Sequence, residues 1–161
     1  MMERVNRIIR NDKFIEFCAH TEDLEHDRIF CRHDMEHALD VARIAVIMAA
    51  DEQLDIERDV IYAAALLHDI GRAQQYINGT EHELASAAIA PYILDECGYN
   101  EDEIDLIVEA IINHGNEAVK DQNDLTGILY RSDKASRKCY MCHAIDMCHK
   151  SPDKMVMEIK Y

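Results

Sequence analysis

The pattern of hydrophobic and polar positions predicts a chain made mostly of helices. Apolar residues recur three or four positions apart, as in Val5, Ile8 and Ile9, and the alternation typical of strands is scarce. Only five glycines and two prolines interrupt the pattern. We expect helices over residues 2–20 (with a break near 11–12), 34–53, 55–72, 80–98 and 100–115, and over the first part of 124–150. These segments predict an all-α bundle of about six or seven helices.

Residues at the ends of these segments indicate where the helices begin and end. Gly71 is expected to end the helix that precedes it, and residues 74–80 are expected to form a loop. Thr80 and Glu83 have the spacing of a capping box at the start of the next helix. No repeat, linker or low-complexity tract divides the chain, so we expect a single domain over residues 1–161.

The composition narrows the classes of partner. The 161 residues are 48% hydrophobic, enough for a real core, and carry a formal net charge of −15. Binding along a nucleic-acid backbone depends on basic surface, so this charge argues against an extended nucleic-acid partner, although it also serves solubility. The basic stretch "RSDKASRK" is better suited to a small phosphate-bearing substrate. No apolar run is long enough for a membrane span and the first residues lack a secretory pattern, so we expect a cytoplasmic protein without a membrane partner.

The stretch "AAALLHDIGR" places His68 and Asp69 side by side in one of the most apolar parts of the chain. Removing a carboxylate from water is costly unless a cationic side chain, hydrogen bonds or a metal ion compensates for it. Further candidates in predicted helices near apolar faces are His37, His82, His114 and Asp133. Imidazole and carboxylate groups from several helices suit zinc, iron, manganese or nickel, whereas any one of these histidines alone can equally be a core or surface residue.

The order of these residues resembles the HD-domain superfamily of metal-dependent phosphohydrolases. The matching contexts are "EHALDVARIA", "AALLHDIGR" and "LYRSDKASR", and the match extends over residues 33–138. The resemblance implies a helical HD-type domain, with a cysteine-containing extension over residues 139–161. It implies hydrolysis of a phosphate ester or phosphoanhydride by metal-activated water. It also implies a set of primary metal ligands, which are His37, His68, Asp69 and Asp133.

Two further contexts, "GTEHELASAAIA" and "EAIINHG", place His82 and His114 where a branch of the superfamily with two metal ions carries additional histidines. This resemblance implies a second ion, with Asp69 bridging the two, and a nucleotide or dinucleotide as substrate. Iron, manganese, nickel and zinc stay open as the metal, with magnesium a further candidate, and one or two ions are compatible with the residues. Judged from the residues alone, His82 can be a surface residue at a helix start, and His114 can interact with a helix dipole.

The segment "HDMEHALDV" resembles the cyclic-nucleotide phosphodiesterases of the superfamily, in which the first histidine protonates the leaving oxygen. His33 lies four residues before His37, so the two share one face of a helix that contains both. The resemblance therefore implies catalytic roles for His33 and Asp69, and imidazole groups titrate near neutral pH, which suits a proton donor. Without the resemblance, His33 can be a solvated residue at a helix start.

Three basic residues beside these motifs are candidates for binding the substrate phosphate, namely Arg72, Lys134 and Arg137. Each can equally be a surface charge that pairs with this acidic protein. The main alternative to an enzyme is a non-catalytic HD module that binds a nucleotide or a partner protein in signalling. A purely structural helical protein is a third hypothesis, which the buried His-Asp pair disfavours. The sequence leaves the substrate and the oligomeric state open.

Three cysteines near the end of the chain, Cys139, Cys142 and Cys148, have C-x2-C-x5-C spacing. With a fourth ligand this spacing can bind structural zinc, but only one C-x2-C unit is present. In an intracellular chain, disulfides are the less common use of such a cluster. The preferred interpretation is a small helical segment that packs its sulfurs inward, and metal binding by these cysteines stays open.

Overall fold

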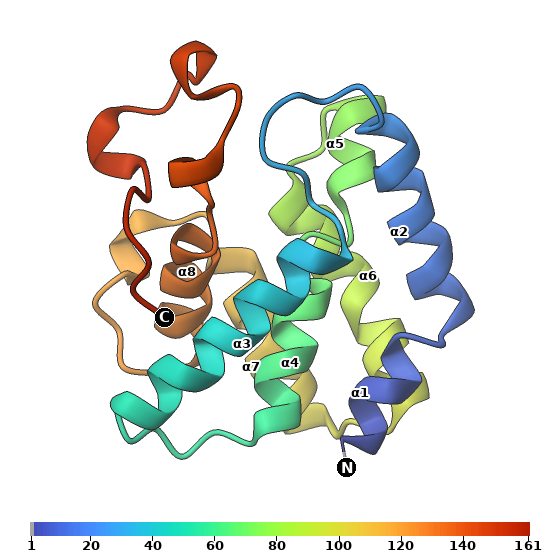
Figure 1. Cartoon of the computed structure of the whole chain (residues 1–161). Coiled ribbons are helices and arrows are strands. Elements are labelled where there is room, and N and C mark those ends of the chain that lie inside the picture. Colours follow the sequence, from blue (N-terminus) through green and yellow to red (C-terminus); the bar gives the residue numbers. More distant parts are fainter. Residues whose placement is uncertain (1) are drawn as a thin grey trace.

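The structure, a computed structural model, describes residues 2–161, and this range contains eight α-helices and no strand, which confirms the predicted all-α fold (Figure 1). The α-helices are α1 (Glu3–Ile8), α2 (Asp12–Leu24), α3 (Met35–Asp51), α4 (Arg58–Leu67), α5 (Arg72–Asn78), α6 (His82–Cys97), α7 (Glu101–Asn113) and α8 (Leu125–Ala135). Single 3₁₀ turns are η1 (Glu117–Val119), η2 (Cys139–Met141), η3 (Ile145–Met147) and η4 (Pro152–Lys154). Among the described residues, no helix has both the length and the apolar character needed to cross a membrane.

Helix α4 forms the centre of the core because its side chains are small or aliphatic around most of its circumference. Seven of its ten residues are buried, and Ala63, Ala64 and Ala65 are completely shielded from solvent. Alanines allow neighbouring helices to approach closely, and both α3 and α7 pack against α4. The helix therefore delivers the residues at its C-terminal end, His68 and Asp69, into the interior of the bundle.

Two predicted boundaries around the His-Asp pair are wrong. Helix α4 ends at Leu67 rather than at Gly71, and the residues from Arg72 to Asn78, mostly expected to be loop, form α5. The cause is a tertiary contact: the Gly71 backbone N–H donates to Ser86 Oγ on α6 at 2.9 Å, and a Cβ at position 71 would lie 2.4 Å from the Ser86 nitrogen. Glycine is therefore required here by the close approach of α6, and it does not mark a helix end.

The observed helix starts agree in part with those predicted from the sequence. The break near residues 11–12 is confirmed, because the Asn11 side chain accepts hydrogen bonds from the first backbone N–H groups of α2. The capping box expected from Thr80 and Glu83 does not form: α6 has no side-chain cap, and the Glu83 carboxylate instead lies against the ring of the first residue of α6. A capping box does form at the start of α7, between Asn100 and Glu103.

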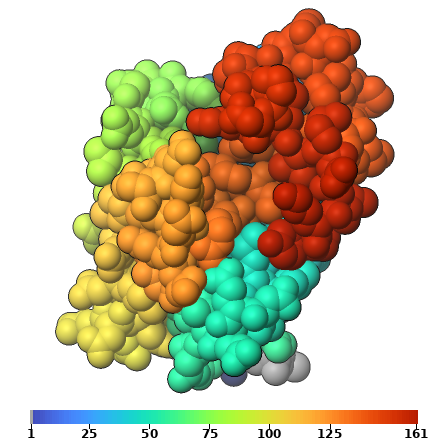
Figure 2. Space-filling model, turned by 90° about the vertical axis from the view of Figure 1, so that its left-hand side faces the viewer, coloured from blue at the N-terminus to red at the C-terminus, as the bar shows by residue number. Residues whose placement is uncertain are grey.

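Two irregular segments stand over one end of the bundle, and we call them together the outer wall: the loop of residues 25–34 and the C-terminal segment of residues 136–161. Figure 1 shows the loop arching from α2 to α3 and the C-terminal segment beside α8. The two segments meet where Phe30 and His149 stack edge to face, with ring centroids 5.9 Å apart. In Figure 2 the surface is hollowed between the red C-terminal segment and the green residues around α5.

Candidate metal centre

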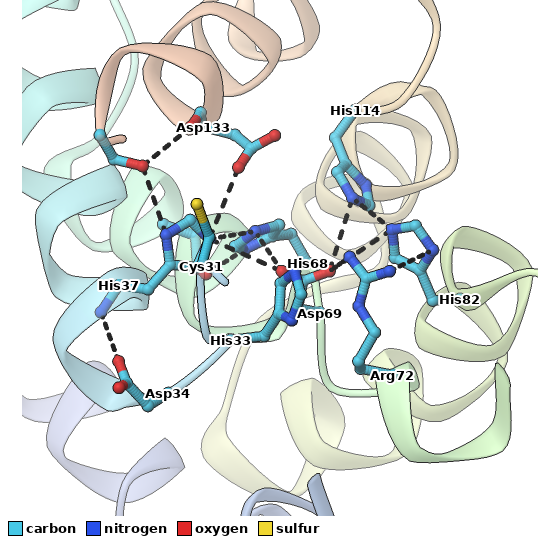
Figure 3. A network of polar contacts seen from close by, with 12 residues as sticks. Cys31, His33, Asp34, His37, His68, Asp69, Arg72, His82, His114 and Asp133 are labelled. Carbon is cyan, nitrogen blue, oxygen red and sulfur yellow. Dashed lines mark hydrogen bonds and ion pairs between the residues drawn. The ribbon is translucent and has the colours of Figure 1, made fainter. Parts of the chain in front are cut away.

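The six residues expected to bind metal lie together, although they come from five helices or the ends of those helices. They are His37 on α3, His68 and Asp69 directly after α4, His82 at the start of α6, His114 directly after α7, and Asp133 on α8. Figure 3 shows that their polar groups point toward one another. His68 and His114 are buried and the other four are half-buried, so solvent reaches the cluster from one side only.

The first group of polar atoms surrounds one oxygen of Asp69. The Nε2 atoms of His37 and His68 are 3.3 Å apart, and Asp69 Oδ2 lies 3.0 Å from His68 Nε2 and 3.6 Å from His37 Nε2. Asp133 Oδ1 lies 3.5 Å from His37 Nε2. Ligands that bind one ion at ~2.0–2.2 Å are themselves roughly 3–3.5 Å apart, so the spacing suits coordination of a common ion.

The second group surrounds the other oxygen of the same carboxylate. His82 Nε2 and His114 Nε2 are 3.1 Å apart, and Asp69 Oδ1 lies 3.4 Å from the first and 3.8 Å from the second. Each of these two groups brings three potential ligand atoms within 4.8 Å of one another. Asp69 therefore offers one oxygen to each group, which is the arrangement of a bridging carboxylate.

Hydrogen bonds to the other ring nitrogens hold the Nε2 lone pairs in place. His68 Nδ1 donates to the Ala65 carbonyl at 2.7 Å, and His114 Nδ1 donates to the Ile111 carbonyl at 2.6 Å. A carbonyl oxygen can only accept, so both Nδ1 atoms carry the proton and both Nε2 atoms present a lone pair. Such hydrogen bonds are the usual support of metal-binding histidines.

The remaining two histidines are oriented by side chains. Ser136 Oγ donates to the Asp133 carbonyl at 2.8 Å and therefore accepts from His37 Nδ1, which lies 3.3 Å away. His82 Nδ1 lies 2.9 Å from a carboxylate oxygen of Glu83 and 3.2 Å from Arg72 Nη1, which donates to it. The facing Nε2 atoms of His37 and His68 therefore both present lone pairs, which repel one another unless a cation lies between them, so these residues fit the binding of a metal ion.

Protonation states in the cluster also suit a metal. Burial raises the pKa of Asp69, but its neighbours His68, Arg72 and His37 together outweigh burial and keep this pKa well below its usual value. Burial raises the pKa of Asp133 too, and the Lys134 ammonium lowers it far below the ordinary range. Burial is the main cause that lowers the pKa of His114, to about 4. The carboxylates are thus ionised and His114 is neutral near pH 7, as metal ligands must be.

The three basic residues expected to bind the substrate phosphate lie at different distances from the predicted metal ligands. Arg72 donates to Asp69 Oδ1 at 2.9 Å, and its Nε is buried with no hydrogen-bond partner among the described residues. Lys134 forms an ion pair with Asp133. Arg137 lies farther out and donates to a backbone carbonyl of the C-terminal segment at 3.3 Å. Arg72 and Lys134 therefore border the predicted metal ligands, whereas Arg137 belongs to the outer wall.

His33 is held by a buried carboxylate that the sequence did not indicate. Its Nδ1 lies 2.5 Å from Glu25 Oε1, and the Tyr76 hydroxyl donates to the same oxygen at 2.5 Å. Glu25 is only 3% exposed. Burial raises the pKa of Glu25, but the hydrogen bonds from His33 and Tyr76 outweigh burial and lower it to about 2. Glu25 is therefore a charged acceptor that fixes the orientation of the His33 ring.

The relation between His33 and His37 differs from the prediction. Helix α3 begins at Met35 with Asp34 as its N-cap, so His33 lies outside the helix and does not share a helical face with His37. Their rings are nevertheless neighbours, in an edge-to-face arrangement with centroids 5.9 Å apart. The loop, rather than the helix, brings His33 to the cluster.

A cavity of about 600 Å³ connects the cluster with the outer wall. Four of the predicted metal ligands line it, namely His37, His82, His114 and Asp133. We call all six predicted metal ligands together the floor. Its size falls within the range of small-molecule binding sites. A ligand in this cavity touches the predicted metal centre at one end and the irregular segments at the other.

The cysteines of the C-terminal segment line the same cavity but form no comparable cluster. Cys139 is buried, Cys142 and Cys148 are half-buried, and all three are free thiols. In residues 2–161, the groups with three or more potential ligand atoms within 4.8 Å are the two His/Asp groups described above. The burial of Cys139 agrees with inward packing of its sulfur.

Comparison with known proteins gives the family. The profile of the HD domain matches residues 34–138. An uncharacterized protein of Clostridium beijerinckii is 39% identical over 160 residues, which cover 99% of this chain and all of that protein. Ribonuclease Y of Mycoplasma mycoides subsp. mycoides is 30% identical over 138 residues, which cover 84% of this chain but 25% of the relative.

A solved structure has the same fold. The crystal structure of a predicted HD superfamily hydrolase from an uncultured Thermotogales bacterium is 24% identical, with a TM-score of 0.60, and the match covers 84% of this chain and 67% of that one. Fold and site together define a helical protein with a His/Asp cluster suited to divalent metal. The chain belongs to the HD-domain family, as its motifs predicted.

Proposed function

We propose that the protein is a metal-dependent phosphohydrolase that cleaves a phosphate ester or phosphoanhydride of a nucleotide or dinucleotide. One observation carries this proposal: the two oxygens of the half-buried Asp69 face two separate pairs of imidazole nitrogens. Divalent ions held there would supply Lewis acidity toward water and phosphate oxygens. Asp69 and Asp133 provide the negative charge that retains such ions, and the four histidines fix their positions.

The neighbouring side chains have roles that follow from their contacts. Arg72, with an unpartnered buried Nε, and Lys134 border the floor and bind oxygens of the scissile phosphate. His33 donates a proton to the leaving oxygen, because Glu25 holds its Nδ1 and leaves its Nε2 for the substrate. In this assignment Glu25 is a positioning residue.

The cavity and the charge favour a small substrate. A volume of about 600 Å³ accommodates a nucleotide or dinucleotide, and the net charge of −15 opposes a long polyanion. RNA is a second candidate substrate, because the relatives named ribonuclease Y are about 30% identical over 138 residues. That match spans a quarter of the length of those relatives, so their activity is a hypothesis here.

The test combines metal content with hydrolysis. Purified protein is analysed by mass spectrometry for bound metal and then incubated with AMP, cyclic AMP, the dinucleotide ApA, diadenosine tetraphosphate and a short oligoribonucleotide. Each substrate is offered with manganese, magnesium, iron, nickel and zinc in turn. We expect hydrolysis of at least one substrate, and we expect His68→Ala to abolish it. His20→Ala, which removes an exposed histidine from α2, serves as the control and retains activity.

Two outcomes contradict the proposal. Bound metal without hydrolysis of any substrate supports the alternative, a non-catalytic HD module. Absence of stoichiometric metal from protein refolded or grown with each ion contradicts the metal centre itself.

A further inference from the structure

Three basic side chains of the outer wall that line the cavity lack the acidic partners that most basic residues of this molecule have. The chain contains 32 acidic and 17 basic residues, and typical basic side chains form short ion pairs, such as Arg131 with Glu52 at 2.7 Å. Arg32, Arg137 and Lys150 all line the cavity, and for none of them does the described range 2–161 provide a carboxylate oxygen within 4.0 Å.

The contacts of these three residues leave their charges uncompensated. Arg32 donates only to backbone carbonyls, those of Arg28 and His26, at 3.4 and 3.0 Å. Arg137 likewise donates to a backbone carbonyl at 3.3 Å. Lys150 is half-buried, and burial together with the charge of Arg137 lowers its pKa. The like charges of Arg137 and Lys150, which are both half-buried, repel one another until an anion lies between them.

We propose that the outer wall is a second anion subsite, so that the substrate of the function proposed above carries a second phosphate besides the one at the floor. Arg137 and Lys150 contact this second phosphate from the C-terminal segment, and Arg32 contacts it from the loop of residues 25–34. The guanidinium groups offer paired donors to phosphate oxygens, and the ammonium offers a point charge. The neighbouring Phe30 and His149 rings supply apolar surface for a nucleobase.

The positions of these residues place the subsite mainly outside the shared HD domain. The HD profile covers residues 34–138, so Arg32 and Lys150 lie outside it on either side. The floor is therefore built from the shared domain, and the wall is built mainly from segments that flank it. A subsite in the wall selects among phosphate-bearing substrates that the floor alone does not distinguish.

The experiment uses ligand pairs that differ by one phosphate. The full-length, metal-loaded chain is titrated with AMP and with adenosine bisphosphate, and then with ApA and with ApA that carries a terminal phosphate. Binding is read by microscale thermophoresis, and chromatography of the same samples reports hydrolysis. In the wild type we expect tighter binding of the ligand with the additional phosphate in each pair. Lys150→Gln is expected to reduce this advantage about tenfold, because one charge-assisted hydrogen bond is lost.

Arg58→Gln is the matched control, because Arg58 is an exposed cation at the start of α4 that is outside the cavity. It removes the same charge and is expected to leave the advantage of the second phosphate unchanged. The subsite is overturned if Lys150→Gln still binds the ligand with the additional phosphate more tightly by the wild-type factor. It is also overturned if this variant loses affinity equally for both ligands of a pair. Hydrolysis without any preference for the second phosphate also overturns it, whereas binding with that preference but without hydrolysis overturns only the proposed function.

Discussion

The floor of the cavity and the outer wall are built in opposite ways. The floor consists of side chains fixed on the ends of helices, and the histidines in it are held by hydrogen bonds from their second ring nitrogens. The wall consists of a loop and short 3₁₀ turns whose side chains are mostly exposed or half-buried. Metal ligands require a fixed geometry, which helices packed in a core provide, whereas recognition of a ligand tolerates irregular segments at the surface.

The floor and the outer wall also differ in how their charged side chains are paired. In the floor each carboxylate lies beside a cationic or imidazole group. Asp69 pairs with Arg72, and Asp133 pairs with Lys134. In the wall, Arg137 and Lys150 have no acidic neighbour within 4.0 Å in the described part of the chain. The floor is thus suited to retaining cations, whereas the subsite proposed in the wall is suited to attracting an anion.

The largest effect is expected from a substitution in the floor. Asp69→Asn preserves the size of the side chain but removes the charge that both groups share. We expect hydrolysis to fall on the order of 10⁴-fold and the bound metal to be lost, as measured by kinetics and elemental analysis. Asp153→Asn in the wall is the control, because this aspartate is exposed on η4. Full metal content in Asp69→Asn would show that the carboxylate is not a ligand.

A second experiment compares the regions directly by hydrogen exchange. Amides of α4 are expected to exchange only when the whole protein unfolds, because this helix is buried among α3 and α7. Amides of residues 139–155 are expected to exchange through small local openings. The difference in protection should be roughly 10³-fold or more, measured by mass spectrometry of peptides. Equal protection would mean that the wall is as rigid as the floor.

Gly71→Ala tests how the floor is assembled. A Cβ at this position would lie 2.4 Å from the Ser86 nitrogen, so α6 must move. We expect the free energy of unfolding to fall by about 1–3 kcal/mol, measured with urea, and metal binding to weaken because α6 carries His82. Gly79→Ala is the comparison, because a Cβ there meets no atom within 4 Å and only the positive φ of 79° opposes it. If both variants have the same stability, the close approach of α6 is not required.

The smallest effect is expected from Glu25→Gln, where the wall meets the floor. The amide retains hydrogen bonding to His33 and Tyr76 but loses the charge, so kcat is expected to fall about tenfold with KM unchanged. His33→Gln should lower kcat further, about 10²-fold. A change in KM alone would assign Glu25 to substrate binding and not to positioning.

The stability difference between the wild type and Glu25→Gln should depend on pH. The pKa of Glu25 is lowered from 4.5 to about 2 in the folded protein, so its ionised form stabilises the fold fully above 4.5 and loses this contribution as the pH falls toward 2. The difference in unfolding free energy between the wild type and Glu25→Gln, about 1–3 kcal/mol at neutral pH, should therefore shrink over that interval. Chemical denaturation at several pH values measures it, and a constant difference would contradict the role of the charge.

Prediction from the sequence succeeded for local features and for the motif residues. Helical periodicity located α3 and α7 closely, because apolar spacing follows from which face a helix buries, and Gly98 located the end of α6. The motif supplied the six candidates that the structure brings together. Glu25 and Tyr76 were missed, because they lie 51 residues apart and no pattern links them. Ser136 stands three residues after Asp133, and this one-turn spacing could have indicated it.

By itself the sequence determined most of the helices, the family and the identities of the candidate metal ligands, because backbone hydrogen bonds and motif spacing are properties of short stretches. Only the tertiary structure decided that Asp69 divides its oxygens between two groups, that Gly71 admits α6, and that Glu25 orients His33. It also decided that cations from both flanks of the HD domain meet at one cavity. These outcomes depend on packing between distant segments, and local periodicity does not encode such packing.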